Sequence, residues 1–154
     1  MLFRSAGIFS VPTLLTEQYP KGLGPVVPGL LESATEIPRV AKLRFSAAVE
    51  ILQHVQRLNE ARAEPIRQIC LAGVETHVCV LQTALELLGS GLQVFTAADA
   101  TGSRFEGDRQ LGLQRMSAAG VQIAAAESLA FEWCGTAEHP RFRELSQLVR
   151  HRGY

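Results

Sequence analysis

Residues 69–88 most constrain the fold, because they change from the pattern of a buried strand to that of a helix within a few residues. The run from Ile69 to Val74 is almost entirely apolar, as is typical of a parallel strand covered on both faces. Gly73 relaxes the backbone before the turn, and Thr76 is suited to cap the helix that follows. Apolar residues then recur at helical spacing over 77–88. The pattern therefore predicts a strand, a tight turn and a helix.

This junction places Cys79 in the first turn of the predicted helix. A thiol in that position faces unpaired backbone N–H groups and the positive end of the helix dipole, and both favour the nucleophilic thiolate. The alternative is a buried structural cysteine, which is the commoner role of a lone cysteine. The position directly after a buried strand favours the functional role, so we take Cys79 as a candidate nucleophile.

Strand patterns alternate with helix patterns along the whole chain. Strands are expected over 11–16, 39–45, 69–74, 92–98 and 121–125, and helices over 47–61 (capped by Ser46), 77–88, 107–119 (stopped by Gly120), 128–133 and 142–150. This alternation predicts a three-layer α/β/α fold with a mostly parallel sheet and helices on both faces, in a single domain over 1–154. In such folds the chemistry gathers at the carboxyl ends of the strands. The candidates there are Glu17-Gln18-Tyr19, the turn over 75–79, and Asp99–Arg104.

Charge and composition narrow the class of partner. Fifteen basic residues balance fifteen acidic ones, so no overall field attracts nucleic acid or a membrane surface. The one basic cluster, 141–152, has apolar residues at helical spacing. This pattern predicts a packed helix whose basic residues form the solvated face. No apolar stretch reaches 18 residues, so no membrane span is expected. The first twelve residues faintly resemble a mitochondrial leader but read better as the end of a helix, and a cytoplasmic location is expected.

The cysteines and histidines give no sign of a disulfide framework or a metal site. Cys70, Cys79 and Cys134 are few and scattered, and no paired Cys or Cys/His spacing typical of zinc ligands is present. His77 and Cys79 lie two residues apart on a predicted helix and so point in different directions. We expect no metal and no cofactor.

Several blocks together resemble the isochorismatase-like cysteine hydrolases, in particular the isochorismatase-domain-containing group. The blocks occur in the family's order and cover nearly the whole chain: TEQYPKGLG (16–24), K-x-x-F-S (42–46), GVETHVCV (73–80), ADATGSR (98–104), and Glu127-Ser128 followed by Phe131. Ordered blocks at matching spacing are far more specific than any one of them.

The resemblance implies acyl-transfer chemistry on a small amide-like substrate. It makes Cys79 the nucleophile and Lys42 the catalytic lysine. It also implies a cis peptide between Val74 and Glu75, which would aim the backbone N–H groups of Glu75 and Cys79 at one point as an oxyanion hole. Glu17, Gln18, Tyr19 and His77 are the pocket candidates. Asp99 is expected to brace the loop that carries Ser103 and Arg104.

The chain departs from the family in one respect. The family's third catalytic residue is an aspartate at the end of its first strand, and this chain has no such strand: its first dozen residues resemble the end of the helix that follows that strand. We therefore expect a domain shortened at its N-terminus, whose neighbouring strands lose hydrogen-bonding partners. Loss of a general base typically lowers a rate by about 10²–10⁴.

Three readings of function remain open on the sequence. The first is a cysteine hydrolase acting through a Cys79 acyl intermediate. The second is a catalytically impaired member that binds a small molecule or serves as an oligomeric scaffold. The third is a purely structural oligomer subunit, with Phe131 and Trp133 at the interface. A homo-oligomer is expected under each reading, with a small-molecule substrate or ligand for the first two and neither nucleic acid nor membrane as a partner.

Overall fold

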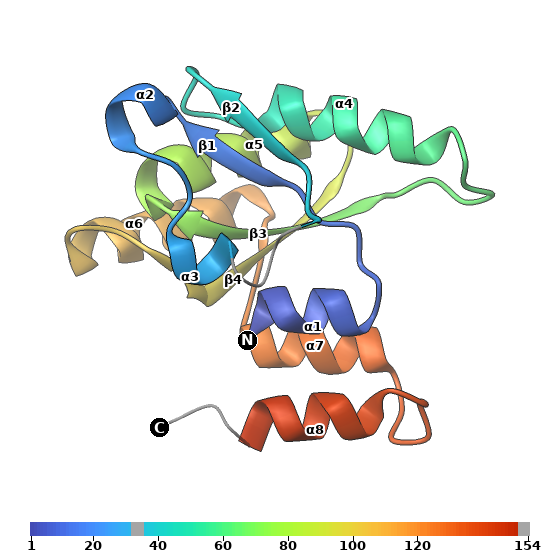
Figure 1. Cartoon of the computed structure of the whole chain (residues 1–154). Coiled ribbons are helices and arrows are strands. Elements are labelled where there is room, and N and C mark those ends of the chain that lie inside the picture. The colour runs from blue at the N-terminus through green and yellow to red at the C-terminus, as the bar shows by residue number, and fades with distance from the viewer. Residues whose placement is uncertain (32–35, 151–154) are drawn as a thin grey trace.

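The computed structural model describes residues 1–31 and 36–150, and its strands are all parallel to their neighbours (Figure 1). The strands are β1 (Leu15–Gln18), β2 (Arg39–Lys42), β3 (Gln68–Val74), β4 (Gln93–Gly102) and β5 (Gln122–Ala124). The helices are α1 (Leu2–Ile8), α2 (Pro20–Leu23), α3 (Pro28–Leu31), α4 (Ala48–Asn59), the π-helical turn η1 (Thr76–Val80), α5 (Leu81–Gly89), α6 (Glu106–Ala119), α7 (Ala126–Cys134) and α8 (Phe142–Arg150). The predicted α/β class with parallel strands is confirmed.

The strands form two sheets rather than one. β1 pairs with β2 in one sheet, and β3, β4 and β5 follow one another in the second. The expectation of a single sheet is therefore wrong for this chain. β1 and β2 pair only with each other, and β3 and β5 form the two edges of the second sheet.

Helices cover both faces of the three-stranded sheet. Successive residues of β4 point to opposite sides, so the two helical layers contact alternate residues of this strand. Val94 packs with α5 and α6, whereas Phe95 and Ala97 pack with α1 and α7. α8 lies outside the second layer and contacts α1 and α7, and these three helices form a stack in Figure 1. The predicted helix at the start of the basic tail is confirmed as α8, whose Leu145 is fully buried; residues 151–152 of that tail lie outside the described part of the chain.

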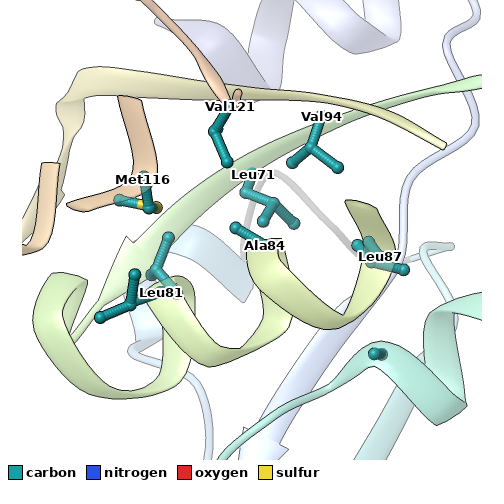
Figure 2. Close-up of a cluster of buried hydrophobic side chains, with 9 residues drawn as sticks. Leu71, Leu81, Ala84, Leu87, Val94, Met116 and Val121 are labelled. Carbon is teal, nitrogen blue, oxygen red and sulfur yellow. The ribbon is translucent and has the colours of Figure 1, made fainter. Parts of the chain in front are cut away.

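The main core lies between β3–β4 and the helices α4, α5 and α6. Side chains of α5 point towards Leu71 on β3 and Val94 on β4, and Met116 of α6 closes one side (Figure 2). Ala84, Leu87 and Met116 have no exposed surface. Because α5 follows directly from η1, this core fixes the position of the turn that carries Cys79.

Several predicted boundaries are wrong, each for a local reason. The strand expected over 11–16 begins only at Leu15, whose N–H donates to the carbonyl of Pro38. The segment between the first two strands, which is not among the predicted helices, contains the short helices α2 and α3. Asp99 lies within β4, not at its end, because that strand continues to Gly102.

The predicted N-cap at Thr76 is also wrong. Thr76 is the first residue of η1, and its hydroxyl donates to the carbonyl of Gly102, 2.9 Å away, rather than to its own helix. The stop at Gly120 is confirmed, since this residue ends α6 with a φ of 103°. None of the helices in the described ranges is long and apolar enough to cross a membrane.

Candidate active site

Cys79 lies in η1, directly beyond the carboxyl end of β3. The carbonyl of Glu75 accepts the N–H groups of both Val78 and Val80, each at 3.2 Å, and the second of these is the i to i+5 bond of a π-helix. The peptide between Val74 and Glu75 is cis. Cys79 itself is half-buried, so its thiol is not sealed within the core.

Three consecutive residues at the end of β4 and after it, 102–104, contact three consecutive residues at the start of the Cys79 turn, 75–77. Thr76 bonds to Gly102 as described above, His77 Nδ1 lies 3.0 Å from the hydroxyl of Ser103, and Arg104 Nε lies 3.1 Å from Glu75 Oε1. Contacts at successive residues leave the turn little freedom to rotate. The block ADATGSR of the sequence is thus adjacent to the block that contains Cys79.

His77 faces this loop and α6. Its Nδ1 lies 3.7 Å from Glu75 Oε2, a buried oxygen that has no hydrogen-bond partner among the described residues, and its Nε2 lies 3.8 Å from Asp108 Oδ2. Helix α6 approaches the backbone of His77 so closely that a Cβ at Gly112 would lie 2.9 Å from the His77 Cα. His77 therefore belongs to the contact between η1 and α6.

Lys42 ends β2 and is buried, with 7% of its surface exposed. Its ammonium group donates to Gln18 Oε1 at 2.7 Å and to the carbonyls of Arg44 at 3.0 Å and Phe45 at 2.7 Å. The Gln18 amide in turn donates to the carbonyl of Leu43. These bonds satisfy all three N–H groups of a charged lysine and wrap the loop after β2 around it.

Lys42 and Cys79 are linked through a third residue. Across residues 1–31 and 36–150, no hydrogen bond joins Lys42 to Cys79 directly. Instead, the buried hydroxyl of Thr83 accepts the N–H of Ala47 at 2.9 Å and donates to the carbonyl of Cys79 at 2.7 Å. Thr83 was not among the site residues predicted from the sequence. The signal available there was its position four residues after Cys79, on the same side of the helix.

The other pocket candidates near β1 have different surroundings. Glu17 Oε1 accepts the N–H of Val26, and so anchors the loop beyond α2. Tyr19 is 48% exposed, has a left-handed backbone (φ 40°), and its ring occupies the space where a side chain at Gly22 would lie. Of the three neighbours Glu17, Gln18 and Tyr19, Gln18 is the one whose side chain bonds to Lys42.

Asp99 contacts the start of α7. Its Oδ1 accepts the N–H of Ala126 at 2.6 Å, at the start of α7. The segment leading to the β4–α6 loop is held by Arg109, which donates to the carbonyls of Ala98 and Thr101.

The remaining cysteines differ from Cys79 in their surroundings. Burial raises the pKa of the Cys70 thiol from 9.0 to about 11, so that this thiol stays protonated near neutral pH. Cys134 is buried with 4% exposure, and its thiol donates to the carbonyl of Thr136. In the described ranges, no three His, Cys, Asp or Glu side chains are grouped so that they could hold a metal ion.

An open depression of about 660 Å³ lies at the opposite end of the strands, lined by Glu64–Gln68 and Gln93. It touches the amino ends of β3 and β4. We place the candidate site at the carboxyl ends because the polar contacts of the buried residues Lys42, Thr76 and Thr83 gather there, as is usual in open parallel sheets.

Comparison with known proteins identifies the class. The isochorismatase domain model matches residues 1–128, and the chain belongs to this family of isochorismatase-like hydrolases. Isochorismatase domain-containing protein 2 of Bos taurus is 42% identical over 149 residues, which are 97% of this chain and 70% of that protein.

Two solved structures extend this comparison. A structure described as a MAR1 ribonuclease from Caenorhabditis elegans has a TM-score of 0.89 and 36% identity, over 99% of this chain and 77% of that one. YcaC of Escherichia coli, described as an octameric hydrolase of unknown specificity, has a TM-score of 0.76 and 29% identity, over 97% and 78%.

Proposed function

We propose that this protein is a cysteine hydrolase that cleaves a small amide-like substrate through a Cys79 acyl intermediate. The Cys79 thiolate attacks the carbonyl carbon, the C–N bond breaks, and the leaving amine takes up a proton. Water then attacks the thioester, which releases the carboxylic acid and regenerates the thiol.

One observation carries this proposal. Cys79 and Lys42 follow two different parallel strands at their carboxyl ends, and the single hydroxyl of Thr83 joins the segments that bear them. A buried lysine whose ammonium is held by three acceptors is fixed in position rather than free in solvent. A cation held in this way can stabilise negative charge that develops beside it during acyl transfer.

The oxyanion of the tetrahedral intermediate needs preorganised donors. We assign this role to the backbone N–H groups of Glu75 and Cys79. Support comes from the contact that fixes this turn: the buried Thr76 hydroxyl donates to the carbonyl of Gly102. One donor of this kind typically contributes about 2.7–4 kcal/mol in the transition state.

The alternative is an impaired family member that binds a small molecule or acts as an oligomeric scaffold. The family aspartate has no counterpart among the residues around Cys79 and Lys42 in the described part of the chain: Glu75 pairs with Arg104, and Asp108 faces His77. Self-association would be compatible with either function, and the octameric E. coli relative makes it a reasonable expectation.

Alkylation separates the two functions without knowledge of the substrate. Iodoacetamide at pH 7 should modify Cys79 at least about tenfold faster than Cys70 and Cys134, as peptide mass spectrometry would show. Cys70, whose thiol pKa is raised, and the buried Cys134 serve as internal controls. Equal, slow labelling of all three would rule out an activated nucleophile and favour the scaffold.

Turnover is tested with a panel of small primary amides, with ammonia release as the readout. Cys79→Ala should abolish release, and Cys79→Ser should lower it by at least about 10². Release that persists in Cys79→Ala would contradict the hydrolase mechanism. RNA is tested in a separate assay, with strand cleavage as the readout, because one similar structure is described as a ribonuclease; the balanced charge of this chain gives no support for binding RNA.

A further inference from the structure

We infer that Thr83 is a positioning residue that sets the Lys42 segment against the Cys79 turn. This inference rests on the proposed function. Thr83 lies on α5, is 4% exposed, and uses its hydroxyl both as acceptor for Ala47 N–H (2.9 Å) and as donor to the Cys79 carbonyl (2.7 Å).

Both ends of this bridge belong to the candidate site. The loop of residues 43–46 wraps the Lys42 ammonium through the carbonyls of Arg44 and Phe45, and Ala47 comes directly after that loop. At the other end, the accepting carbonyl belongs to the nucleophile itself. A shift of Thr83 would therefore move Lys42 relative to the thiol.

The bridge matters because no strand pairing connects the two segments. β2, which carries Lys42, and β3, which leads to Cys79, lie in separate sheets. The same loop also makes the Arg44–Glu86 ion pair with α5, but those side chains are 58% and 41% exposed. Exposed pairs contribute little, whereas a buried hydroxyl bond does not compete with water.

The bond from Thr83 to the Cys79 carbonyl would not by itself indicate a positioning role. A threonine in a helix often donates to the carbonyl four residues back, as Thr83 does to Cys79. The second bond sets this residue apart, because it accepts an N–H from a residue 36 positions earlier in the chain. Valine has nearly the same shape as threonine, so Thr83→Val would remove both bonds and leave the packing.

The experiment measures the rate of Cys79 alkylation by iodoacetamide from pH 5 to 10. The variants are Thr83→Val, Thr83→Ser, Lys42→Gln, the double Thr83→Val/Lys42→Gln, and Glu86→Gln as the matched exposed control. Thr83→Ala is a second deletion of the hydroxyl, should the valine variant fold poorly. Thermal unfolding is recorded for each.

Thr83→Val should lower the rate at pH 7 about tenfold, because the segment that carries the Lys42 cation is no longer fixed against the Cys79 turn. Thr83→Ser and Glu86→Gln should stay within twofold of the parent. The double variant should match Lys42→Gln alone, since both changes act through the same cation.

Two results would overturn the positioning role while the proposed function stands. One is a Thr83→Val profile that superimposes on the parent while Lys42→Gln is shifted. The other is a double variant whose loss is the sum of the two single losses. If parent Cys79 reacts no faster than Cys70 and Cys134, the proposed function fails, and the positioning role fails with it.

Discussion

Buried polar side chains carry the candidate site at the scale of single residues. Lys42, Thr76 and Thr83 are all buried, and each has a hydrogen-bond partner on a different element of the chain. Buried polar groups without partners are costly, so these contacts hold their residues in one arrangement. The site is thus fixed by a few hydrogen bonds between segments distant in sequence.

Cys70 gives a prediction about stability against pH. Its pKa is raised from 9.0 to about 11 by burial, so the folded state keeps the proton when the unfolded state has lost it. This contribution is fully present below pH 9 and is lost as the pH rises from about 9 to about 11. Between pH 8 and 10.5 the parent should lose about 2 kcal/mol more unfolding free energy than Cys70→Ala.

Urea unfolding in reducing buffer at the two pH values measures the difference. Because lysine, tyrosine and arginine groups titrate equally in both proteins, only the comparison of the two slopes is informative. Equal slopes for the parent and Cys70→Ala would contradict the prediction.

At the scale of elements, the packing of α6 against η1 sets the position of the Cys79 turn. The two elements meet at Gly112 and His77, where the absence of a side chain lets the helix approach the backbone. The added Cβ of an alanine would meet the Cα and N atoms of His77 at 2.9 and 3.1 Å. Backbone atoms cannot turn aside as a flexible side chain would, so the turn itself must move.

Gly112→Ala should therefore lower the unfolding free energy by about 1–3 kcal/mol and slow the alkylation of Cys79. Gly107→Ala is the matched control, since it changes the same helix at a position with no neighbouring atom within 4 Å. That control should be neutral or stabilising by up to about 1 kcal/mol. Urea unfolding and labelling rates check both; equal effects of the two substitutions would contradict the packing argument.

The described strands form two separate sheets, and packing between helices α4 and α5 connects them. β1 and β3 each have one hydrogen-bonded neighbour, but α4 packs on α5 above them, and Ala48 belongs to the same core as Leu81. An unpaired strand edge with apolar side chains, such as Val74 with 72% exposure, is prone to pairing between molecules.

Self-association should accordingly depend on the free edge of β3. Ala72→Lys, at an exposed position of β3, should weaken association by about 1 kcal/mol, or roughly fivefold in the dissociation constant. Gln122→Lys is the control, at an exposed position of β5, the other edge of this sheet. It should have a smaller effect, because that edge strand is only three residues long. Sedimentation velocity over a range of concentrations distinguishes them. A larger effect at Gln122 would place the contact elsewhere.

Local pattern predicted the elements better than it predicted their ends. The helix ending at Gly120 and the helix over 142–150 were both expected, because a glycine stop and a helical repeat are signals within a few residues. The π-helical turn at Thr76–Val80 and the extension of β4 through Asp99 were not expected. Both depend on partners across the sheet, such as the Gly102 carbonyl that accepts from Thr76.

The sequence by itself determined the alternation of strands and helices and the class of fold, because periodicity is a local property. It also predicted Cys79 as a candidate nucleophile, and the family resemblance of its motifs added Lys42 as a candidate. Only the tertiary structure decided that the strands form two sheets, that Gln18 holds Lys42, and that Thr83 joins the two halves of the site. The physical reason is that the hydrogen-bonding partners of these hydroxyl and amide groups lie on segments distant in the sequence. Folding brings Ala47 to Thr83 across 36 residues, and nothing in the spacing of either segment specifies that meeting.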